Sequence, residues 1–121
     1  MSRDGSTVLD WGPDTFKFRI GWADLEMLQE ATDMGPWLLQ ARLEQKTCRV
    51  GEIAEVMRCG LIGGGVEPVR AKKLVDQYVK GRPPAESILH AYAILTIALQ
   101  GAPDEPPSGE AEAASETAET A

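Results

Sequence analysis

The sequence contains few of the residues that most enzymes and metal sites use. Among its 121 residues are two cysteines, Cys48 and Cys59, and one histidine, His90. Neither cysteine has neighbours at metal-ligand spacing, and a Cys/His nucleophile pair would rest on His90 alone. His90 lies within an apolar helical run, where histidines are usually packed or partly exposed. We therefore expect no metal, no cofactor and no catalytic residue, and the chain is not predicted to be an enzyme.

A long apolar run is also missing. The longest apolar stretch, from Ile88 to Leu99, spans 12 residues and includes His90 and Thr96. Because a helix needs about 20 apolar residues to cross a bilayer, we predict no membrane-spanning segment. Two cysteines in a chain without a signal segment fit a reducing compartment, so we expect a cytoplasmic protein.

Basic residues are not concentrated into a surface that could bind nucleic acid. Of the 19 acidic residues, six lie in residues 102–121, which leaves 13 against 12 basic residues in residues 1–101. Neutralising phosphates requires clustered Lys and Arg. Arg70, Lys72 and Lys73 form a small group, but Glu67 and Asp76 flank it. A solvated helix face is the better interpretation, and no nucleic-acid partner is predicted.

The composition divides the chain into three parts. Residues 1–6 are small and polar, which predicts a flexible N-terminus. Residues 7–101 are long enough for a single globular domain with a modest core. Residues 102–121 are acidic and carry no large apolar side chain, so we predict a disordered tail. Such a tail is either a solubilising segment or an attractant for a basic partner.

Two short segments near the N-terminus have strand character. Residues 7–11 and 15–20 are rich in β-branched and aromatic residues, and Gly12-Pro13-Asp14 separates them. In the second segment Phe16 and Phe18 alternate with Lys17 and Arg19. The pattern predicts a β-hairpin with one apolar face, which must pack on helices because a lone hairpin is marginally stable.

Helical spacing dominates the rest of the chain. Apolar stripes and proline or glycine boundaries predict helices over residues 22–33, 36–44, 51–59, from 68 to about 80, and 85–100. In the first of these, Trp22 is placed on the apolar stripe with Leu25 and Leu28. The last helix is apolar on most of its circumference, so it is either central or hides a face against a partner. The predicted fold class is mainly α, with about five helices and a short N-terminal hairpin.

The most unusual stretch joins the third and fourth predicted helices. It contains four glycines in six residues, Gly60, Gly63, Gly64 and Gly65, which surround Leu61-Ile62. We interpret Gly60 as a left-handed helix cap and Leu61-Ile62 as a plug that pins the crossover into the core. The following glycines would let the chain turn, with positive φ at Gly64. A phosphate-binding loop is disfavoured, since no Lys-Ser/Thr pair follows and no strand precedes the glycines.

The order of these segments resembles the gene transfer agent family. The resemblance covers about residues 7–101 and rests on the hairpin, residues 24–31, Leu43, residues 53–56, residues 58–65, residues 71–75 and an apolar last helix ending in residues 99–101. Members are encoded among phage-type tail genes and are regarded as tail assembly chaperones or tail-tube-associated proteins. The family provides no established catalytic residue to carry over.

The resemblance implies a tail assembly chaperone that escorts a tail component, such as the tape measure protein, in the cytoplasm until the tail tube polymerises. The alternative is a structural subunit retained in the tail tube or at the head–tail junction. A DNA-binding regulator is disfavoured because residues 51–59 lack a basic recognition surface. We expect the partner-binding face beside Tyr92, Leu95 and Leu99, and near Leu61-Ile62, although apolar residues at helical spacing are also typical of a core.

Overall fold

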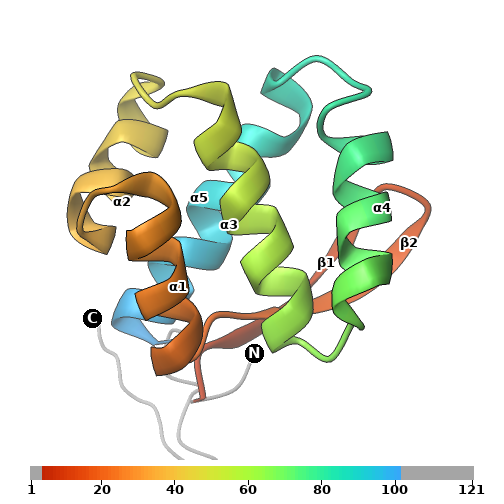
Figure 1. Ribbon diagram of the computed structural model, residues 1–121, viewed down its shortest axis with the longest axis horizontal. Helices are drawn as coiled ribbons and strands as arrows, with labels where there is room; N and C mark the ends of the chain where they lie inside the picture. Colours follow the sequence, from red (N-terminus) through yellow and green to blue (C-terminus); the bar gives the residue numbers. More distant parts are fainter. Residues whose placement is uncertain (1–3, 102–121) are drawn as a thin grey trace, which may run out of the picture.

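Five helices and one hairpin make up the part of the chain that the structure, a computed structural model, describes, which is residues 4–101 (Figure 1). In chain order the elements are β1 (Ser6–Trp11), β2 (Asp14–Arg19), α1 (Trp22–Thr32), α2 (Pro36–Gln45), α3 (Val50–Gly63), α4 (Pro68–Tyr78) and α5 (Ala85–Gln100). The predicted mainly α fold with an N-terminal hairpin is confirmed. The predicted disordered tail lies outside the described residues.

Helix α3 is the centre of the fold. It lies between α1 and α4, with α5 behind it, and α2 packs on α5 at the edge of the bundle (Figure 1). Most of its residues are apolar, and eight of its 14 positions are buried, from Glu52 to Leu61. A helix that is apolar on most sides is stable only when other elements surround it. The central helix is therefore α3, so of the two alternatives predicted for α5, a central place or a face hidden against a partner, the first is not observed.

One buried carboxylate organises the start of α3. Glu52 is 3% exposed, and its two oxygens accept hydrogen bonds from the backbone N–H and the Nε–H of Arg49, at 2.9 and 2.7 Å. The Arg49 guanidinium also donates through Nη2 to the carbonyl oxygen of Thr32, at 3.2 Å. These bonds satisfy groups that a helix terminus leaves unpaired. They also join the end of α1 to the beginning of α3.

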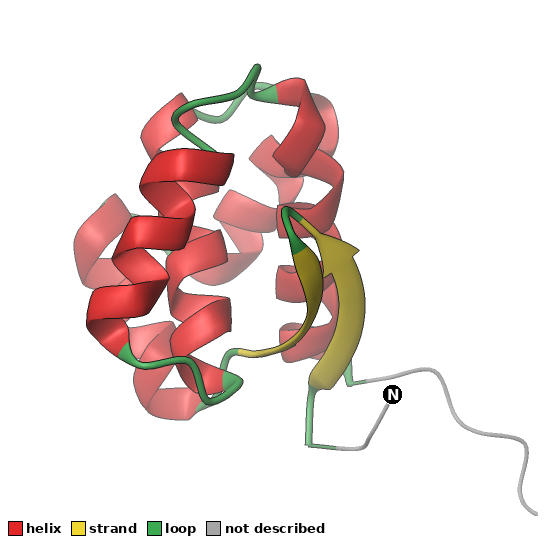
Figure 2. Cartoon of the chain, turned by 90° about the vertical axis from the view of Figure 1, so that its right-hand side faces the viewer, coloured by secondary structure: helices red, strands yellow, loops and turns green. Residues whose placement is uncertain are grey.

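The hairpin lies along one side of the helices (Figure 2). Its two-residue turn pairs Trp11 with Asp14, and Gly12 takes the positive φ of 61° that such a turn requires. Phe16 and Phe18 are buried as the alternation predicts. The indole N–H of Trp11 donates to the Ser87 hydroxyl at 3.1 Å, so β1 is anchored to α5.

The N-terminal boundary lies earlier than predicted. Ser6 is buried and pairs with Arg19 at the first position of β1. Its backbone N–H donates to the carboxylate of Asp4 at 3.0 Å. Strand β1 thus begins at Ser6 and not at Thr7, because small polar residues can occupy a strand when their backbone is paired.

The glycine stretch differs from its predicted form. Helix α3 continues through Gly60 to Gly63, so Gly60 is not a left-handed cap. Gly64 has a φ of −82°, and within this stretch positive φ occurs only at Gly65, at 113°. A Cβ on Gly63 or Gly64 would overlap the carbonyl oxygens of Arg19 and Lys17 in β2. Close approach between helix and strand, and not backbone handedness, therefore requires glycine at both positions.

Gly60 has a related role inside the helix. A Cβ there would come within 3.1 Å of the Ile94 side chain and 3.2 Å of the Phe18 ring. The missing side chain allows α3 to pack against β2 and α5 at the same point. Glycine inside a helix lowers helix stability by about 1 kcal/mol relative to alanine. At position 60 an alanine would instead crowd the Ile94 side chain and the Phe18 ring.

We predict that Gly64→Ala lowers the free energy of unfolding by about 3 kcal/mol, because its Cβ can be accommodated only by moving β2 away from α3. Gly51→Ala is the matched control on the same helix, since no atom lies within 4 Å of the added Cβ. It should raise stability by about 0.5–1 kcal/mol. Urea unfolding of both variants measures the two effects. Equal stabilities would contradict the close approach of strand and helix.

Candidate protein-binding surface

The residues predicted to bind a partner do not form one surface. Leu61 and Leu95 are completely buried among the core side chains, so they support the fold and offer no surface to a partner. Ile62, Tyr92 and Leu99 are partly buried and pack against that core. Among the three, Leu99 also lines an apolar groove at the end of α5. Of the face expected along α5, Tyr92 and Leu99 are therefore the residues that remain partly exposed.

Two tryptophans are the most prominent apolar groups on the surface. Trp22 is 80% exposed and Trp37 is 65% exposed, whereas Trp11 is buried. The predicted stripe of α1 is correct for Leu25, Leu28 and Thr32, which are buried or pack against the core, but wrong for Trp22, the exposed first residue of the helix. Exposed tryptophan side chains are uncommon in stable monomers and typical of binding surfaces.

The starts of two helices place these tryptophans side by side on one groove. In α1 the backbone N–H of Gly21 donates to the carboxylate of Asp24 at 3.1 Å, which makes Trp22 the first helical residue. Pro36 begins α2, so Trp37 lies in its first turn. The Gln40 amide donates to the Thr96 hydroxyl at 3.0 Å and holds α2 against α5.

The groove between them has a volume of about 160 Å³. Its lining comes from α1, α2 and the last turn of α5, and consists of Trp22, Leu25, Glu26, Gln29, Pro36, Trp37 and Leu99. Met27 and Leu38 are also exposed on the same two helices. Four of the eight large apolar side chains exposed among the described residues therefore belong to α1 and α2. Sequence reasoning identified Leu99 alone; Trp37 could have been found because it lies off the stripe formed by Leu39 and Leu43.

The charge next to this groove is negative. Helix α1 contains three acidic residues, Asp24, Glu26 and Glu30, and no basic residue. Glu26 and Glu30 are exposed, and neither takes part in any of the ion pairs within residues 4–101. The groove is thus an apolar surface bordered by carboxylates that have no neutralising partner in the described part of the chain.

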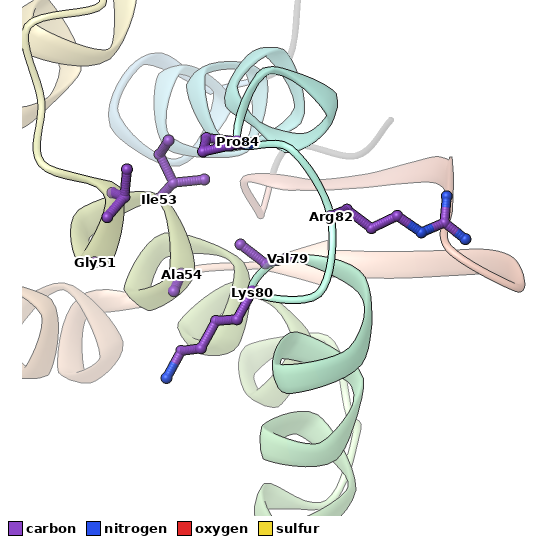
Figure 3. Close-up of a pocket in the computed structure, with 8 residues that line it drawn as sticks. Gly51, Ile53, Ala54, Val79, Lys80, Arg82 and Pro84 are labelled. Carbon is purple, nitrogen blue, oxygen red and sulfur yellow. The ribbon is translucent and has the colours of Figure 1, made fainter.

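A second apolar pocket, of about 290 Å³, lies between the start of α3 and the loop that joins α4 to α5 (Figure 3). Two cations belong to its lining but are engaged elsewhere. Lys80 pairs with Asp76 at 3.5 Å. Arg82 extends away from the pocket, pairs with Glu86 at 3.3 Å and lies over the Tyr78 ring. No polar groups converge in this pocket as a catalytic site would require.

The two thiols lie in environments that disfavour the thiolate form. Cys59 is fully buried, and burial raises its pKa to about 11. The pKa of the Cys48 thiol is also raised, mainly by partial burial. Across residues 4–101, no three His, Cys, Asp or Glu side chains are grouped so that they could hold a metal ion. Within the same range, no helix is both long and apolar enough to cross a membrane.

Comparison with known proteins defines the class. Residues 4–101 match the family model described as phage tail tube protein, GTA-gp10, which is a family of phage tail proteins. Since the match covers most of the sequence, the chain belongs to this family, and the predicted relation to gene transfer agents is confirmed. A search of curated proteins found no match, and neither did a search of solved structures.

The buried Cys59 thiol predicts a loss of stability at high pH. Its pKa rises from the ordinary value of 9.0 to about 11 on folding, so the folded protein keeps a proton that the unfolded chain loses. The stability that the protonated thiol contributes is fully present below pH 9 and is lost as the pH rises through 11. The free energy of unfolding should fall by about 2–3 kcal/mol over this range. Unfolding free energies of wild type and Cys59→Ala should converge over this range. Parallel curves would contradict the assignment.

Proposed function

We propose that this protein is a tail assembly chaperone, which binds a tail component such as the tape measure protein and releases it when the tail tube forms. Family membership supports a role in phage-type tails. The observation that carries the finer proposal is the exposure of Trp22 and Trp37, which line one groove. A chaperone needs an apolar surface that is open before its partner arrives.

The number of apolar surfaces favours a chaperone over a tube subunit. A subunit that polymerises head to tail needs two different complementary interfaces. Exposed apolar side chains gather on α1 and α2, whereas Val8, Val50, Val69 and Leu89 lie singly on four other elements. The single apolar surface on α1 and α2 is what a chaperone needs to bind one segment of a partner, whereas a polymerising subunit would need a second. Competition by tube subunits would release that segment without nucleotide.

The alternative is a structural subunit that remains in the tail tube or at the head–tail junction. The description of the matching family as a tail tube protein supports it. Under either proposal the protein acts through protein contacts and not as an enzyme or a nucleic-acid binder. For the chaperone, we also propose a cytoplasmic location during tail assembly.

Affinity capture from cells that express the tail genes, followed by mass spectrometry of complexes and of purified particles, separates the two proposals. For a chaperone we expect the tape measure protein in the complexes and none of this chain in particles. Stoichiometric amounts in finished particles would contradict the chaperone proposal and support the structural subunit.

A further inference from the structure

We propose that the groove between Trp22 and Trp37 binds an amphipathic helix whose apolar stripe is flanked by lysine or arginine. This inference deepens the proposed function and rests on it for the claim that the helix belongs to a tail component. It adds the surface and the chemistry of the bound segment. Three observations support the proposal: the two indole rings that line the groove, its size, and the carboxylates of Glu26 and Glu30 on α1, which have no ion pair among the described residues.

The walls of the groove suit a small number of large apolar side chains. Its volume of about 160 Å³ is close to that of one or two aliphatic side chains, and Leu25, Pro36 and Leu99 contribute to its apolar lining. Trp22 and Trp37 also line it, and their rigid, flat rings lose little conformational entropy on binding. One turn of a helix, with apolar residues at i and i+3 or i+4, can fill such a space.

The negative charge of α1 favours a bound helix that has basic residues beside its apolar stripe. Glu26 lines the groove, and Glu30 follows one turn later on α1. Because neither has an ion pair among the described residues, a lysine or arginine beside the apolar stripe gains a charge partner without breaking one. The same cation can also lie over an indole face, which adds cation–π attraction.

Charge also argues against two other occupants. Residues 102–121 carry six acidic residues and no basic one, so these carboxylates would repel the chain's own C-terminal segment. A second copy docked by two-fold symmetry would bring the acidic face of α1 against its equivalent, with Glu26 facing the same region of the partner. A basic amphipathic helix faces neither penalty.

Two synthetic helical peptides of about 18 residues test the proposal with the full-length protein. Both carry leucine at i, i+3, i+4 and i+7; one has lysine on its polar face and the other has glutamate. Calorimetry and tryptophan emission measure binding. We expect the lysine peptide to bind about tenfold or more tightly than the glutamate peptide, with a blue shift as Trp22 and Trp37 leave water. The difference should narrow at about 0.5 M salt.

Substitutions locate the binding site. Trp22→Ala combined with Trp37→Ala should weaken lysine-peptide binding about tenfold or more, since both side chains are exposed and contribute little to the fold. Glu26→Gln with Glu30→Gln should weaken it about threefold and reduce the salt dependence. Leu89→Ala with Val69→Ala is the matched control, because these exposed apolar residues lie on other helices, and it should leave binding unchanged.

Several results would overturn the proposal. Equal binding of both peptides would remove the charge selection, and binding unaffected by the tryptophan substitutions would place the site elsewhere. Self-association abolished by those substitutions would identify a second copy as the occupant. A red shift on deleting residues 102–121 would identify the chain's own tail. If the Trp22→Ala, Trp37→Ala variant lost peptide binding but still captured the tape measure protein, the groove would not be the site that binds the tail component. The proposed chaperone function would then stand without this surface.

Discussion

The packing of β2 against the last turn of α3 is the constraint on which the rest of the fold depends. Gly63 and Gly64 bring the helix backbone against the carbonyl oxygens of Arg19 and Lys17, at a distance that any side chain would prevent. This contact holds the hairpin in place, and the hairpin then buries Phe16 and Phe18 against the helices. A two-stranded hairpin is marginal alone, so its order depends on this junction together with the anchoring of β1 to α5 through Trp11 and Ser87.

That junction also determines which surface is left for a partner. The hairpin, α1, α4 and α5 cover α3, and half of the exposed large apolar side chains among the described residues lie on α1 and α2. The glycine-dependent core is therefore distinct from the groove, which is lined by two indoles and by the carboxylate of Glu26. Binding at the groove therefore needs no rearrangement of the buried residues.

The elements were predictable because local patterns determine them, whereas side-chain directions depend on distant residues. Alternation identified β2, and proline at Pro36 and Pro68 identified two helix starts. Gly60 was misassigned because its role depends on Phe18 and Ile94, which are remote in sequence. Trp22 was misplaced because, at 3.6 residues per turn, it lies outside the arc of α1 that Leu25, Leu28 and Thr32 share. The groove could not be predicted, since it combines residues from three helices.

The most direct test of the central claim, that this protein binds a tail component through the Trp22–Trp37 groove, is site-specific photo-crosslinking in cells that express the tail genes. A benzophenone amino acid replaces Trp37 in one variant and Val69, which is equally exposed on α4, in another. The account predicts that the probe at position 37 captures a lysine- or arginine-flanked helical segment of a tail protein, and that the probe at position 69 does not. Equal capture at both positions, or capture only at position 69, would contradict it.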